Sequence, residues 1–196
     1  MASEQFARAI AAIDAANAAD PNQVVVRGIE CPKELAHAQL VTEWVEKLEP
    51  DASEALLLAA RAHHLRRWTI PRASYPEGRS GYLRWRKQLH EKHATEVAEI
   101  LADAGYDDAT NARVQDLVRK RGLGRDAEVQ VLEDSLCLVF AETQLLDLAA
   151  RVDADKMVDV VRKTLVKMSP RAIALAGELD LPPDARALLA RASASS

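Results

Sequence analysis

The chain has 196 residues, of which 48% are hydrophobic and 4% aromatic, and its formal net charge is −4. This length suits one compact domain with an ample core. The acidic balance argues against general coating of nucleic acid, and no apolar run reaches the roughly 18 residues that a membrane span needs.

The compartment is predicted from the cysteines and the N-terminus. Cys31 and Cys137 are the two cysteines, and they lie far apart in the sequence. We expect free thiols in a reducing, cytoplasmic setting. The amphipathic N-terminus lacks the organisation of a signal peptide, which agrees with this prediction.

Helical periodicity and capping residues predict an all-α fold, in which only the short run 24–26 reads as a strand. In chain order, helices are expected over about 3–19, 32–48, 54–68, 80–104, 108–122, 127–150 and 154–168, followed by a short helix from Ser169-Pro170 and a last one after Pro183. The predicted N-caps of four of these helices are Ser3, Ser53, Asp108 and Asp126. Pro71, Pro76 and Gly78 indicate a loop over 69–79.

These elements are expected to form a single compact multi-helix domain. Residues 1–150 would be a helical core with an Arg/aromatic loop at 66–86, and the helices of 151–196 would pack on the same domain and end in a frayed tail. These C-terminal helices read as an amphipathic cover and are a candidate face for a homodimer.

The basic charge is concentrated in one segment. Residues 61–93 contain seven arginines, four of the eight aromatic residues and four of the five histidines. From Arg61 to Lys87 the charge is +7, which leaves −11 for the rest of the chain. An acidic protein with one arginine-rich, aromatic-rich segment is predicted to bind an anion there, because guanidinium forks suit phosphates and aromatic faces suit bases.

The predicted anion site lies at the loop between two helices. The alternative is an ordinary solvated face with the aromatic residues in the core, but nearby like charges repel, which favours a ligand. The predicted substrate-binding residues are Arg66, Arg67, Trp68, Arg72, Tyr75, Arg79, Arg84 and Arg86.

Several histidines lie on apolar helix faces. His37 shares a face with Leu40, Val41 and Trp44, and His93 continues a line through Trp85 and Leu89. At least one of the pair His63 and His64 is buried on the same criterion.

Two acids lie in the apolar helix VQVLEDSLCLVF. Glu133 and Asp134 share faces with its apolar residues, and buried carboxylates must be paired, hydrogen-bonded or metal-bound. With the inward histidines they make up a ligand set for a divalent ion: His37, His63, His64, His93 and Asp134, with Zn, Mn, Fe or Co as the candidates. The alternative is a structural network, in which the acids pair with Arg61 or Arg66 and the histidines donate to carbonyls.

The strings AARAHHLRRWTIPRASYPEGRSGYLRWRKQLHEKHA and EVQVLEDSLCLVF resemble a helical family of bacteria and fungi known as a domain of unknown function. The resemblance covers about residues 3–150. It implies a single all-α unit and supplies no established activity.

The chain also resembles the HD-domain metal phosphohydrolases. They use a His, then a His-Asp pair about a helix later, and a late Asp; this chain has His37, then His63-His64, then Asp134, with His64 at the place of their first Asp. The resemblance implies a degenerate HD-like helical core.

Two classes of function follow. The preferred one is a metal-dependent, HD-like hydrolase acting on a nucleotide or other phosphorylated small molecule, with Glu133 as general base and the segment 61–87 holding the anion. Iron at the same site would allow oxidative chemistry instead. The alternative is a non-catalytic module that binds a nucleotide, an RNA feature or an acidic ligand without metal.

Overall fold

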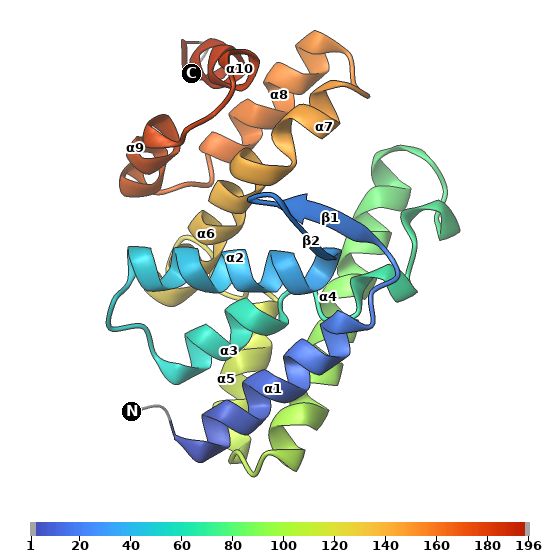
Figure 1. Ribbon diagram of the computed structural model, residues 1–196, viewed down its shortest axis with the longest axis vertical. Coiled ribbons are helices and arrows are strands. Elements are labelled where there is room, and N and C mark those ends of the chain that lie inside the picture. Colours follow the sequence, from blue (N-terminus) through green and yellow to red (C-terminus); the bar gives the residue numbers. More distant parts are fainter. Residues whose placement is uncertain (1–2, 195–196) are drawn as a thin grey trace. The chain divides into compact units, whose positions relative to one another are not determined.

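The computed structural model describes residues 3–194 and confirms the all-α prediction. By its internal contacts the chain divides into two compact units, residues 1–122 and 123–196 (Figure 1). The predicted division into a core over 1–150 and a cover over 151–196 stays a prediction.

The first unit contains five α-helices, a hairpin and two short 3₁₀ turns within its described residues. Its elements are α1 (Glu4–Ala18), β1 (Gln23–Val26), β2 (Ile29–Pro32), α2 (Lys33–Leu48), α3 (Glu54–Ala62), η1 (Arg67–Thr69), η2 (Arg72–Ser74), α4 (Gly78–Asp103) and α5 (Asp108–Val118). Helix α3 is its centre: it packs against α1, α2 and α5, and Leu56 and Leu58 are fully buried.

Between α1 and α2 the chain forms a hairpin, in which the strand predicted over 24–26 is paired with a second strand that was not predicted. Strands β1 and β2 lie side by side (Figure 1) and pair antiparallel. Val26 lies opposite Ile29 in this pairing. Arg27 and Gly28 both have positive φ, at 50° and 80°. This is the backbone of a two-residue hairpin turn, for which glycine in the second position is favoured.

Helix α3 ends earlier than its predicted limit of Trp68. Ser53 accepts a hydrogen bond from the Leu56 amide and begins the helix as expected, but the helix ends at Ala62. Arg66 adopts a left-handed conformation with φ 48°, and its amide donates to Asn17 Oδ1 in α1. The chain therefore turns at residues 63–66 instead of continuing as a helix.

The loop between α3 and α4 is held by specific contacts. Arg72 donates to the carbonyls of Tyr75 and Pro76, and the Trp85 indole donates to the carbonyl of Ile70 over 2.9 Å. Gly81, in the first turn of α4, lies directly against the Pro76 carbonyl. The predicted loop is thus an ordered structure packed on the start of α4.

The second unit consists of α6 (Ala127–Thr143), α7 (Leu145–Ala149), α8 (Ala154–Leu165), α9 (Pro170–Glu178) and α10 (Pro183–Ala194). The predicted helix over 127–150 is interrupted at Gln144. Helix α8 buries Met157, Val161 and Leu165 at a four-residue spacing and packs mainly on α10. Among the described residues, no helix has the length and apolarity that crossing a bilayer requires.

Candidate functional site

Five histidines from three helices gather inside the first unit. We call His37 on α2, His63 and His64 after α3, and His90 and His93 on α4 the histidine cluster. The His37 and His64 rings stack with centroids 4.0 Å apart and planes 12° from parallel, and His63 stacks on His64 at 5.0 Å. His90 and His93 each lie 6.1 Å from a ring of the pair His63 and His64. The predictions that His37 and His93 point inward, and that at least one of His63 and His64 is buried, are confirmed, since His37, His63 and His93 are buried.

Burial keeps four of these five imidazoles neutral. It lowers the pKa of His37 to about 3, with a further contribution from the Arg67 charge. Burial likewise lowers the pKa of His93 to about 3, against the opposing effect of its hydrogen bond with the Leu65 carbonyl. The pKa values of His63 and His64 also lie well below the ordinary value, mainly because of desolvation. At neutral pH His37, His63, His64 and His93 therefore offer uncharged rings with lone pairs.

Glu34 belongs to this site, although the sequence reasoning did not single it out. It lies in the first turn of α2, one turn before His37, and its Oε2 is 3.0 Å from His64 Nδ1. Burial raises its pKa from 4.5 to about 7, and the charges of Arg67 and Lys33 oppose this rise. Glu34 is therefore poised to gain or lose a proton near neutral pH.

A glutamate in a first turn ordinarily complements the helix dipole, which is why Glu34 did not stand out in the sequence. Its spacing of three residues from His37 was the available signal, because it places both side chains on one face of α2.

Arg67 connects the basic segment with the histidine cluster. Its amide donates to the His64 carbonyl over 3.0 Å, and its guanidinium lies over the Trp85 ring, 4.8 Å from the centroid. The pKa of Arg67 is lowered, first by burial, against the favourable charge of Glu34, and Arg86 lowers it further. Within residues 3–194 no ion pair joins the Arg67 guanidinium to a carboxylate. The guanidinium groups of Arg67 and Arg86 thus lie close enough to repel each other, and Arg67 is half-buried.

The other predicted arginines are used in different ways. Arg72 donates to two loop carbonyls, as described above. Arg66 lies 3.9 Å from Glu96, and Arg86 stands over the Tyr82 ring at 5.9 Å. Arg79 and Arg84 are exposed on the first turns of α4. Of these arginines, Arg86 is thus the one whose charge acts on Arg67, and Arg72 has a structural role in the loop.

The aromatic residues of the basic segment also differ in their surroundings, since some are half-buried or hydrogen-bonded and one is exposed. Trp68 is half-buried, and the Tyr75 hydroxyl donates to the Gln88 side chain. The Tyr82 ring is 42% exposed and tilts against Trp85, with centroids 5.9 Å apart. Tyr82 is thus the exposed flat surface beside Arg86, a role that the sequence had suggested for Trp68 and Tyr75.

The histidine cluster does not have the arrangement of a metal centre. Three buried nitrogens, His37 Nε2, His63 Nδ1 and His93 Nε2, have no hydrogen-bond partner among residues 3–194. Neutral imidazole is the ligand form, so the chemistry of the donors suits a metal. However, in the part of the chain that the structure describes, no three His, Cys, Asp or Glu side chains are grouped so that they could hold an ion. Imidazole lone pairs lie in the ring plane, so the face-to-face rings of His37 and His64 do not aim them at one point.

The predicted acids of α6 lie in the second unit. Asp134 Oδ1 accepts hydrogen bonds from the Gln130 side chain and from the Ser169 amide, at 2.9 Å each. Glu133 lies 3.6 Å from Lys167 Nζ. These contacts connect α6 with the turn before α9, so both buried acids have partners. Their predicted roles as metal ligand and general base stay predictions.

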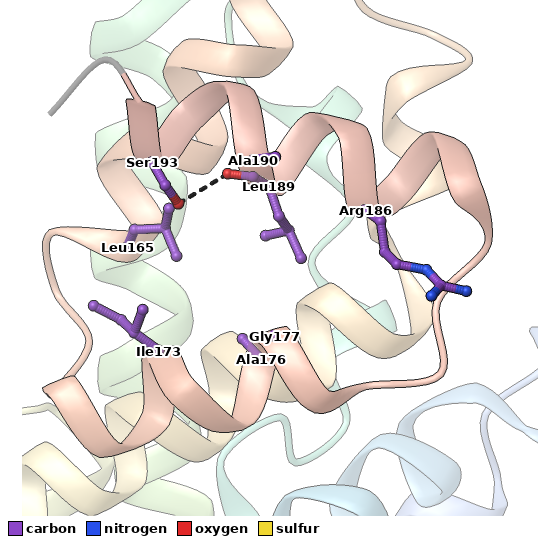
Figure 2. A pocket seen from close by; sticks show the side chains of 8 residues that line it. All are labelled: Leu165, Ile173, Ala176, Gly177, Arg186, Leu189, Ala190 and Ser193. Carbon is purple, nitrogen blue, oxygen red and sulfur yellow. Dashed lines mark hydrogen bonds between the residues drawn. The ribbon is translucent and has the colours of Figure 1, made fainter.

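The second unit also contains an apolar cavity of about 240 Å³ between α9 and α10 (Figure 2). Leu165 and Ile173 lie at one end and Arg186 at the other, with Leu189 directed into the space between the helices. Ser193 Oγ donates to the Leu189 carbonyl, and Arg186 Nε donates to the Leu181 carbonyl. Among the described residues that line the cavity there is no acid, histidine or cysteine, so acid–base chemistry is better supported at the histidine cluster.

Comparison with known proteins places the chain in one family. No curated protein and no solved structure matches it. The family described as "Domain of unknown function (DUF4202)" matches residues 7–189, which is nearly the whole chain and extends well beyond residue 150. The chain therefore belongs to the DUF4202 family of domains of unknown function.

Proposed function

We propose that the protein is a hydrolase that acts on a phosphorylated small molecule, whose phosphate binds between Arg67 and Arg86 beside the histidine cluster. The observation that carries this proposal is the half-buried guanidinium of Arg67. It has no carboxylate partner within ion-pair distance in the described chain, and its charge acts on Glu34, His37 and His64. An anion bound to Arg67 would therefore lie next to groups that can transfer protons.

The electrostatics of the pair favour a dianion as the ligand. Arg86 and Arg67 disfavour each other's charge, and Glu34, the carboxyl group that acts on Arg67, is largely protonated below pH 7. A phosphate group offsets both positive charges and accepts hydrogen bonds from both planar forks. A structural role for Arg67 alone would favour a permanent carboxylate partner instead.

The exposed Tyr82 ring supports a substrate with a flat ring. It stands beside Arg86, so a molecule whose phosphate lies between the two arginines could stack its ring on Tyr82. Stacking of a base on an aromatic side chain contributes about 1–3 kcal/mol. A nucleotide is therefore the substrate class that the site supports best.

No step of the proposed reaction involves a metal ion, since the rings of the histidine cluster are not arranged to bind one. The divalent ion predicted from the sequence has its own test, which is elemental analysis of protein purified without an affinity tag or chelator. Near-stoichiometric metal that is lost in both His64→Ala and Asp134→Ala would replace the metal-free interpretation.

The test of the proposed function is a phosphatase screen with nucleoside phosphates and p-nitrophenyl phosphate. Arg67→Gln should raise KM about 10- to 100-fold, because a lost charged hydrogen bond costs about 1.5–3 kcal/mol. Arg125→Gln is the matched control, since Arg125 is an exposed arginine outside the basic segment and should leave KM unchanged. No turnover of any of these compounds, or equal KM values in the two variants, would refute the proposal.

A second candidate is binding without turnover, which the exposed face of α4 favours. Tyr82 and Leu83 are 42% and 53% exposed and lie among the exposed Arg79 and Arg84. A nucleotide or RNA bound there should dissociate as salt rises, and Arg84→Gln should weaken it. Binding of a fluorescent nucleotide that is insensitive to ionic strength would count against this candidate.

A further inference from the structure

His64 differs from the other rings of the cluster in how its nitrogens are used. Its Nδ1 lies 3.0 Å from Glu34 Oε2, while its side chain remains 18% exposed. In contrast, His37, His63 and His93 each bury a nitrogen that has no partner in the described chain. His64 is therefore the ring of the cluster that is both oriented by a carboxylate and partly open to solvent. Its Nε2 is the nitrogen that a substrate could reach.

Its neighbours determine the tautomer and the orientation of this ring. An ionised Glu34 accepts a hydrogen bond, so Nδ1 must carry the proton and Nε2 keeps its lone pair. The His37 ring, stacked at 4.0 Å and nearly parallel, restricts rotation of the imidazole. A neutral imidazole with one nitrogen held by a carboxylate and the other open has the arrangement of an activated nucleophile.

We propose that His64 is the nucleophile of the reaction and that the enzyme forms a phosphohistidine at Nε2. This inference rests on the proposed function and specifies its chemistry. The Nε2 lone pair forms a bond to phosphorus while the ester P–O bond breaks. The electron pair of the broken bond leaves with the substrate oxygen, which takes a proton from water. A water molecule then attacks phosphorus, and the N–P bond breaks to release inorganic phosphate and restore the neutral ring.

Glu34 and Arg67 have separate tasks in this step. The ring becomes cationic when Nε2 is phosphorylated and Nδ1 keeps its proton, and the Glu34 carboxylate in contact with it offsets that charge. The Arg67 amide donates a hydrogen bond to the His64 carbonyl, which keeps the two residues together, and the Arg67 guanidinium neutralises the phosphoryl oxygens. Glu34 acts through His64 and is thus a positioning residue.

Formation of the phosphoenzyme should increase with pH, because only ionised Glu34 fixes the reactive tautomer. Burial raises the pKa of Glu34 to about 7, so the increase should be centred near that pH. The charged and titratable groups that act on Glu34 are His64 after α3, Arg67 in η1, Lys33 on α2 and Asp20 before β1. Arg67 and Lys33 favour the carboxylate, Asp20 disfavours it, and His64 stays neutral through this range.

The experiment is rapid mixing of the full chain with p-nitrophenyl phosphate, and with a nucleoside monophosphate as second substrate. We expect a burst of product that approaches one equivalent per chain, and a phosphoryl group that survives alkali but not acid. Peptide mapping by mass spectrometry should place this group on His64. In Glu34→Gln the burst should fall at least tenfold and lose its rise near pH 7.

Two variants and one direct measurement keep the test decisive. His64→Asn should abolish the burst, whereas Arg125→Gln, the exposed control outside the basic segment, should retain the burst and the phosphoryl group on His64. If His64→Asn does not fold, the mapping on the unmodified chain still decides between His64 and the other histidines.

The outcome of the rapid-mixing experiment distinguishes a wrong role for His64 from a wrong function. Steady turnover with no trapped phosphoryl group, or with the group on another residue, overturns the role of His64 and leaves the hydrolase proposal standing. No turnover and no phosphoenzyme with either substrate overturns both.

Discussion

Replacing Gly81 by alanine tests the close approach of the loop to α4. A Cβ at this position would stand 1.9 Å from the Pro76 carbonyl oxygen and 2.8 Å from its carbon. Real Cβ atoms essentially never come within 3.0 Å of such atoms, so the loop and the helix would have to separate by about 1 Å. The obstructing atoms belong to backbone, and Arg72 holds the same carbonyl over 3.0 Å. The contact cannot be relieved by rotating a side chain.

The magnitude follows from two opposing effects. Overpacking of this kind costs about 1–3 kcal/mol, while alanine in place of glycine within a helix contributes about 0.8–1.0 kcal/mol. We therefore expect Gly81→Ala to lower the free energy of unfolding by up to about 2 kcal/mol. Ser80→Ala is the matched control, because Ser80 is exposed in the same turn and its replacement should stabilise by only a few tenths of a kcal/mol.

Tryptophan fluorescence during urea unfolding is the suitable assay. The three tryptophans are Trp44, Trp68 and Trp85, so all of them report on the first unit. The Trp85 indole donates to the Ile70 carbonyl of the same loop, so displacement of the loop should also shift the folded-state emission. If Gly81→Ala is more stable than the parent by the full helix contribution, and its emission is unchanged, the close approach is refuted.

Further predictions concern pH, an ion pair and a second glycine. Because the buried histidines have lowered pKa values, their contribution to stability is present above pH 6.5 and is lost as the pH falls toward about 3; the urea midpoint should drop steadily below pH 6.5. Glu34 has a raised pKa, so its contribution to the free energy of unfolding is present below pH 4.5 and falls by about 3 kcal/mol as the pH rises through about 7. The stability of Glu34→Gln relative to the parent should therefore be higher at pH 8 than at pH 5, and the same stability difference at both pH values would contradict this. Asp14→Asn should cost about 1.5–3 kcal/mol, since Arg61 donates two hydrogen bonds of 2.6 and 2.7 Å to the Asp14 carboxylate; an unchanged midpoint would show that the pair is dispensable. Gly177→Ala in α9 has open space around its Cβ and should stabilise the second unit by about 0.5–1 kcal/mol in circular dichroism melts, and a loss of stability would indicate a hidden contact.

The beginnings of helices could be predicted from the sequence because capping is a local interaction. Ser53 and Asp126 accept hydrogen bonds from amides two or three residues later, as expected, and Ser169 does the same before Pro170. The cap of α5 is Asp107, one residue before the predicted Asp108. Both neighbours are aspartates, so the sequence could not distinguish them.

Other features depend on contacts between distant residues. Helix α3 ends at Ala62 because Arg66 turns to meet Asn17, which is 49 residues away in the sequence. The hairpin was predicted only in part: the run 24–26 reads as a strand, but its partner over 29–32 was overlooked, although Arg27-Gly28 was a usable turn signal. Inward-facing histidines could be recognised by helical spacing, but their stacking and the contact of His64 with Glu34 require the packing of α2 against α3.

Asn17 has a consequence for how the first unit assembles. It is fully buried in α1, and its Oδ1 is the acceptor for the Arg66 amide. Apolar side chains alone would tolerate several placements of α1 along its neighbours. Sliding α1 by one helical turn, about 5.4 Å, would separate this acceptor from its donor and leave the buried side-chain oxygen of Asn17 unsatisfied. A single amide side chain thus sets the register in which the first helix docks, and it does so at the turn that presents His64 and Arg67.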